Sequence, residues 1–228
     1  MSGKRQRNIV GHHLRARLQR GRDSERGAAL VESTICFIAL FTILFSGVEF
    51  AMVMRASETA QGAALDASRV ASASGREPAF YDIVIAKLNT SSKAMQDNSP
   101  IEAWIFRSEG GEALNSVGNP VASMSLCDDC IRLVWVASGG SGGTWQVAPE
   151  FGGASVTADV RAGNFTLLDS RIWRPSAMST CVDPGTDEVT VAVSTDYQAV
   201  TGLVPFVPTR FDRQNSGALE PRPAGQCN

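Results

Sequence analysis

One long apolar segment limits what this chain can fold into. Residues 28–54 contain no lysine, arginine, aspartate or histidine, and the sixteen residues between Glu32 and Glu49 carry no charge. A helix over residues 28–54 would be about 40 Å long, whereas the hydrocarbon core of a bilayer is about 30 Å thick. We therefore predict a transmembrane helix over residues 28–54. The alternative is a buried core helix of a soluble protein, but such helices rarely run this long without a polar stripe.

Charge is distributed unevenly on the two sides of the apolar segment. The first 27 residues hold eight basic and two acidic side chains, a net charge of +6, and the other 201 hold thirteen basic and twenty-one acidic ones, a net charge of −8. Positive charge beside a spanning helix stays in the cytoplasm, which predicts a cytoplasmic N-terminus and an exported C-terminal domain. The alternative is a nucleic-acid-binding arm. The basic segment has no interleaved aromatic residues, so no nucleic-acid partner is expected.

Two glutamates interrupt the apolar segment near its ends, and their positions carry a family resemblance. Glu32 is the fifth residue after Gly27, and Gly27 directly follows the basic segment. The string RGAALVE (residues 26–32), followed by GVEF (residues 47–50), resembles the TadE/TadF group of tight-adherence (Flp) pilus assembly proteins. These are pseudopilins with an N-terminus like that of type IV prepilins. The resemblance is specific only over residues 25–55.

The resemblance implies processing, partners and a location. A prepilin peptidase would cut between Gly27 and Ala28, Glu32 would meet the new N-terminal amine of a neighbouring subunit, and Glu49 would be a second assembly residue. The partners would be other pilin and pseudopilin subunits, the inner-membrane assembly platform and membrane lipid. The protein would be a single-pass protein of the bacterial inner membrane with a periplasmic domain, and its entry into a surface pilus stays open. The chain departs from many major pilins in its long leader and in having Ala28, rather than Phe, after the cut.

The chain divides into four predicted parts. These are a basic cytoplasmic leader (1–27), the transmembrane helix (28–54), a helical stalk (55–98) and a periplasmic sheet domain with a loop-like tail (99–228). Frequent alanines favour helix over residues 55–74. A second helix is expected over residues 79–95, where Phe80, Ile83, Val84, Lys87 and Leu88 recur at helical spacing.

The C-terminal part of the sequence favours β-strands. Residues 101–106, 130–136 and 188–194 are rich in β-branched and aromatic side chains, and weaker candidates are residues 155–160 and 165–173. The tail from residue 213 to residue 228 has the composition of a loop. No connecting helices are expected between the strands, so the sheet should be antiparallel and the fold class α+β.

Cysteines supply a further expectation. Cys36 lies inside the apolar segment, and four more cysteines, an even number, lie in the part expected outside the cytoplasm, where disulfides persist. Of the three possible pairings we favour Cys127 with Cys130 and Cys181 with Cys227. Two alternatives remain. The spacing from Cys127 to Cys130 is that of redox motifs, although two aspartates between the cysteines would raise thiol pKa values. A four-cysteine zinc site is possible by ligand count, although one pair lacks the usual short spacing.

The sequence argues against catalysis in the exported part. Both histidines, His12 and His13, lie in the leader, which excludes histidine-based triads and metal sites from the rest of the chain. No enzyme activity, cofactor or metal is therefore expected. Besides the pseudopilin hypothesis, two alternatives stay open. One is an unprocessed, signal-anchored periplasmic binding or scaffold protein, and the other is a membrane-tethered enzyme with a pocket in its sheet domain.

Overall fold

The structure is a computed structural model of the chain. It describes residues 7–94, 100–115, 118–138, 142–163, 171–181, 185–197, 199 and 210–221, and its side-chain detail begins at Gly27. The chain divides into two units, with the boundary in the first helix between Phe50 and Ala51.

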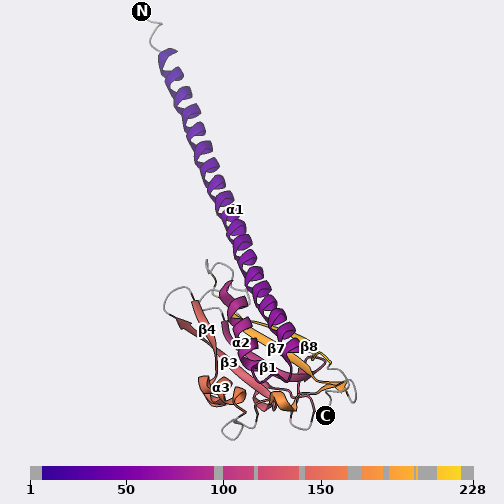
Figure 1. The fold of residues 1–228 in the computed structure, drawn as a ribbon. Coiled ribbons are helices and arrows are strands. Elements are labelled where there is room, and N and C mark those ends of the chain that lie inside the picture. The colour runs from indigo at the N-terminus through magenta and orange to yellow at the C-terminus, as the bar shows by residue number, and fades with distance from the viewer. Residues whose placement is uncertain are drawn as a thin grey trace, which may run out of the picture. The chain divides into compact units, whose positions relative to one another are not determined.

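The first unit contains most of a long helix. Helix α1 spans Arg7–Ser74 (Figure 1). Every described side chain from residue 27 to residue 45 is exposed. The hydroxyls of Thr34, Thr42 and Ser46 each donate to the carbonyl four residues earlier, at 2.7 to 2.8 Å. Since these polar groups are satisfied within the helix, they add little cost to placing it in an apolar medium. Of the helices described, this one is long and apolar enough to cross a membrane.

The second unit is built on an antiparallel sheet (Figure 1). Its strands run in the order β4-β3-β1-β7-β8, with β2 paired to the end of β1. Their bounds are β1 Pro100–Glu109, β2 Glu112–Ala113, β3 Cys130–Ser138, β4 Gly142–Val147, β7 Glu188–Asp196 and β8 Arg210–Ala218. A separate two-stranded sheet pairs β5 (Thr180–Cys181) with β6 (Gly185–Thr186).

The remaining helices are shorter. They are α2 (Phe80–Ser91) and α3 (Val156–Arg161), with 3-10 turns η1 (Ser92–Ala94), η2 (Met124–Leu126), η3 (Pro149–Phe151), η4 (Gly153–Ser155) and η6 (Pro175–Ala177). Two helices followed mainly by antiparallel strands confirm the α+β prediction.

The last turns of α1 pack on one face of the sheet, along strand β8. The Arg213 guanidinium donates to Ser57 Oγ at 2.7 Å, and the Asn215 side-chain amide donates to Ser68 Oγ at 2.6 Å. Four α1 residues in this stretch are completely buried: Ala60, Ala64, Ala67 and Ala71. Their spacing of three or four puts them on one helix face, and their small side chains let the helix backbone lie close to the strands.

Helix α2 covers the other edge of the same sheet face. Asn89 Oδ1 accepts from the Trp145 backbone N–H at 2.6 Å, and the Trp145 indole donates to Ser92 Oγ at 2.9 Å. The second helix was predicted at nearly this position. The predicted apolar face was wrong in one respect: Phe80, Tyr81, Val84 and Leu88 are buried, whereas Ile83 is 38% exposed.

Two strand and loop predictions were wrong, and one strand was missed. Residues 156–161 form helix α3, because Val156 and Val160 lie four residues apart and both reach the core. Strand β8 spans Arg210–Ala218, so residues 213–218 of the tail predicted as a loop are strand. Strand β4 was not predicted, because the glycines before it suggested a loop. The other weak strand candidate, residues 165–173, lies mostly outside the described residues, and residues 171–173 are not strand.

Tyr81 links α2 to the segment before η6 and offers a test of this packing. Its buried hydroxyl donates to the Trp173 carbonyl at 2.5 Å, and burial raises the pKa of the Tyr81 phenol well above its ordinary value. Tyr81→Phe should cost about 1–3 kcal/mol of unfolding free energy, because the carbonyl loses its donor. Because the pKa of Tyr81 is raised in the folded protein, its contribution to the free energy of unfolding is fully present below the unfolded-state pKa of about 10. The contribution is lost as pH rises above that value.

Urea unfolding at pH 7 and pH 10.5, followed by tryptophan fluorescence, measures both effects. Tyr81→Phe should be less stable than wild type at pH 7 and should lose less stability on going to pH 10.5. An equal alkaline loss in both proteins would contradict the role of Tyr81.

Candidate functional site

The candidate site lies on α1 around the predicted cleavage position. Gly27 and Ala28 both lie within the helix, and Glu32 follows about one turn later. These three residues line a shallow surface depression together with Val31, Ile35 and Cys36. Ala28 and Glu32, four residues apart, lie on the same side of the helix, and Gly27 adjoins them at the edge of the depression.

Gly27 is not required by the fold. A Cβ added at this position would meet nothing within 4 Å, and the residue has no left-handed backbone conformation. A glycine inside a helix costs roughly 0.5–1 kcal/mol relative to alanine. Since the described structure gives no packing reason for glycine here, its presence favours a role outside folding.

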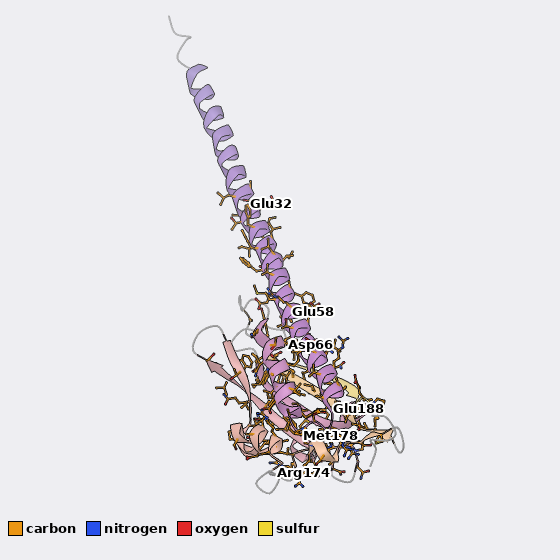
Figure 2. All side chains as sticks on the ribbon, viewed as in Figure 1. Glu32, Glu58, Asp66, Arg174, Met178 and Glu188 are labelled. Atoms are coloured by element: carbon orange, nitrogen blue, oxygen red, sulfur yellow. The ribbon has the colours of Figure 1, made fainter. Side chains whose placement is uncertain are left out.

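The Glu32 carboxylate is exposed on the helix surface (Figure 2). Among the described side chains, none forms an ion pair or hydrogen bond with it. A carboxylate inside an apolar segment is costly unless it lies near an end or meets a cation. Glu32 is thus available to a partner supplied by another molecule.

Glu49 differs from Glu32 in its surroundings. It is 0% exposed and takes part in an interaction within the chain. The assembly role expected of Glu49 stays a prediction, and its carboxylate is buried within the chain. Of the two glutamates, Glu32 is the one that the structure leaves accessible.

An aromatic stripe marks the side of the helix away from Glu32. Phe37, Phe41 and Phe45 stack in succession, with ring centroids 6.4 and 6.1 Å apart. Phe41 is nine residues from Glu32, and at about 100° per residue this places it on the opposite side. The spacing F-x-x-x-F-x-x-x-F is visible in the sequence and could have identified this stripe. The apolar helix therefore has a glutamate side and an aromatic side.

The sheet domain holds the other predicted site residues, the cysteines. Cys127 and Cys130 are buried free thiols, so the expected disulfide between them is not present in this structure. Cys181 is disulfide-bonded, while Cys227 lies outside the described residues, so its pairing stays a prediction. Among the described residues no group of three or more metal-binding side chains occurs. Cys36 is a free thiol exposed on α1.

Charged groups on the open face of the sheet are paired with one another. Arg132 contacts Glu102 at 2.9 Å and Glu150 at 2.6 Å, and Arg210 contacts Glu102 at 2.7 Å. The hydrogen bond from Arg132 lowers the pKa of Glu150 below its ordinary value. Partly exposed pairs of this kind contribute about 0–1 kcal/mol each. The network is therefore a modest structural feature, and none of these four carboxylate or guanidinium groups stands apart as an acid–base catalyst.

Comparison with known proteins finds a family match for part of the N-terminal helix. Residues 27–69 match the model of a family described as "TadE-like protein". No curated protein and no solved structure matches the chain. The match begins at Gly27, includes Ala28, Glu32 and Glu49, and ends within α1. One apolar N-terminal helix and a TadE-like match together fit a single-pass membrane protein with a function related to a Tad pilus. Residues 27–69 are thus a TadE-like segment, which confirms the resemblance to TadE-like pilus assembly proteins.

Proposed function

We propose that this protein is a pseudopilin or minor pilin that acts in assembly of a tight-adherence (Flp, type IVb) pilus. A prepilin peptidase removes residues 1–27, and Glu32 then guides assembly with other pilin and pseudopilin subunits at the inner-membrane platform. One observation carries the proposal. The TadE-like match begins at Gly27, a glycine that the described fold does not need, and continues into an apolar helix with an exposed Glu32.

The membrane segment that we propose begins at Ala28 and ends near Phe50. A helix over these residues is roughly 34 Å long, enough to cross a hydrocarbon core of about 30 Å. Further along, Val53 is buried in a cluster with Tyr197 and Phe211 of the second unit, so the spanning segment should end about one turn earlier than residue 54. The leader stays cytoplasmic and the sheet domain is periplasmic, as the net charge of +6 before Ala28 favours.

The role of Glu32 follows from the cut. Cleavage after Gly27 leaves a free amine on Ala28, at the membrane edge and about one helical turn from Glu32. An amine and a carboxylate at this depth each lower the other's cost of leaving water. Between neighbouring subunits such a pair would set how far one helix is shifted along the next. The exposed Glu32 carboxylate supports this arrangement.

The alternative function is an unprocessed, signal-anchored binding or scaffold protein. A depression of about 520 Å³ in the sheet domain favours it; the lining includes Phe106, Glu112, Met124 and Gln214. In that case the cut after Gly27 would not occur.

The mass of the N-terminus decides between these functions. Protein isolated from its native membrane should begin at Ala28, with residues 1–27 absent from the intact mass spectrum. Gly27→Leu should retain the leader, because the side chain obstructs the peptidase. Gly47→Leu is the matched control, since Gly47 lies on the same helix and is equally uncrowded, and it should be processed normally. A wild-type protein that begins at Met1 or Ser2 would refute the processing and support the alternative.

A further inference from the structure

The turn that precedes strand β3 holds two cysteines side by side. Cys127 and Cys130 are both buried, and both are free thiols. The Cys130 thiol donates to the Cys127 carbonyl at 3.0 Å and lies within hydrogen-bonding reach of the Cys127 side chain. The Cys127 thiol donates to the Asp128 carbonyl at 3.2 Å. The two sulfur atoms are therefore neighbours in the folded chain, which is what the formation of a disulfide between them needs.

Several contacts hold this turn in one conformation. Asp129 has a φ of 58°, a left-handed conformation that is uncommon for residues other than glycine. Its carbonyl accepts from the Arg107 backbone N–H at 3.1 Å, and the Arg107 guanidinium contacts the carboxylates of Asp129 at 3.5 Å and Asp187 at 3.1 Å. The Cys130 N–H donates to the Arg171 carbonyl at 2.7 Å. The turn thus joins strands β1 and β3 to the segments before η6 and β7.

We propose that Cys127 and Cys130 are a site of oxidation, at which an exported thiol–disulfide oxidoreductase forms an intramolecular disulfide, and that the structure describes the reduced form. The proposal rests on the proposed function, which places the domain in an oxidising compartment. One cysteine thiolate attacks the disulfide of the oxidoreductase, forms a mixed disulfide and releases one enzyme thiolate. The second cysteine then attacks the substrate sulfur of the mixed disulfide. Two electrons and two protons pass to the enzyme, which leaves as a dithiol.

The surroundings determine when this reaction takes place. Both sulfur atoms are buried, so an oxidant protein cannot reach them in the closed domain. The hydrogen bond with Cys127 and burial also raise the pKa of the Cys130 thiol well above its ordinary value, which keeps it unreactive. The disulfide therefore forms during folding, while Cys127 and Cys130 are still accessible. For the same reason the finished pair has no part in redox catalysis.

Trapping of thiols in the native protein tests the proposal. Cells are quenched with acid, and the full-length protein is alkylated with iodoacetamide in denaturant without reductant and then digested. The peptide that contains Cys127 and Cys130 should carry no label and be about 2 Da lighter than its reduced form. Cys36 should be labelled. Label on Cys127 and Cys130 with Cys181 unlabelled would overturn this inference alone, whereas label on Cys181 as well would overturn the proposed periplasmic location.

A second measurement separates oxidation during folding from oxidation afterwards. The purified protein is unfolded, reduced and refolded, and is then treated with a small maleimide. Cys127 and Cys130 should react roughly tenfold or more slowly in the folded protein than in denaturant, because the domain must open first. Equal rates in the folded and the unfolded protein would refute the proposed timing. Cys36→Ser removes the thiol of the apolar segment, and it should leave the cross-linked peptide unchanged.

Discussion

Replacing Glu32 with alanine should abolish surface piliation while cleavage after Gly27 continues. The carboxylate is exposed at the start of the apolar helix, and no described side chain pairs with it. A charge at the centre of a membrane helix costs about 3 kcal/mol on insertion scales, and this is an upper guide for Glu32 near the helix end. If pairing with an amine of a neighbouring subunit removes this cost, the association constant between the subunits rises by at most roughly a hundredfold. Pili would be counted by electron microscopy, and the N-terminus would be identified by mass spectrometry.

Two further variants sharpen this test. Glu32→Gln keeps the size and hydrogen-bonding capacity of the side chain but removes its charge, and it should behave like Glu32→Ala. Ser33→Ala is the matched control, because Ser33 is the exposed neighbour and its hydroxyl donates to the Leu30 carbonyl at 2.9 Å. Normal piliation in Glu32→Ala would refute the assembly role. Loss of cleavage in the same variant would instead place Glu32 in recognition by the peptidase.

Leu88→Ala should be the most destabilising of the substitutions considered. Leu88 is 0% exposed in the core beneath α2, so its truncation leaves a cavity and should cost about 2–5 kcal/mol. The full-length protein in detergent would be unfolded with urea and followed by the fluorescence of its four tryptophans, all of which lie in the second unit.

Ile83→Ala supplies the comparison on the same helix. Ile83 has a side chain of the same size as Leu88 but is 38% exposed, so its truncation should cost less than about 1 kcal/mol. A similar loss in both variants would show that α2 is packed differently from the structure described here.

The long helix, the second helix and three central strands could be predicted, because each has a strong local pattern. Strand β8 could not. Its nine residues, RFDRQNSGA, include only two apolar side chains, Phe211 and Ala218. Apolar alternation is absent because the strand lies at the edge of the sheet and meets α1 through polar side chains, such as Arg213 on Ser57 and Asn215 on Ser68. Such contacts depend on a helix far away in the sequence, which no local pattern reports.

The candidate site also has features that could be predicted from the sequence and features that could not. Gly27, Ala28 and Glu32 could be proposed from the sequence, because the resemblance that singles them out depends only on their positions along the chain. The difference between Glu32 and Glu49 could not, since both are isolated acids in an apolar run and only the folded chain shows that one is buried. The wrong strand at residues 155–160 has a different origin. Val156 and Val160 fit a strand by composition, but their spacing of four suits the helix that forms.

The pairing of β8 with α1 has a consequence for the order in which the domain forms. Arg213 and Ser57 are separated by 156 positions, and in the topology proposed above, with the leader held in the cytoplasm, Ser57 is exported long before Arg213. The alanine face of α1 would therefore stay partly uncovered until strand β8, near the C-terminus, has also been exported. Closure of so long a loop is slow compared with local folding. During that interval the incomplete domain is exposed to chaperones, proteases and other subunits.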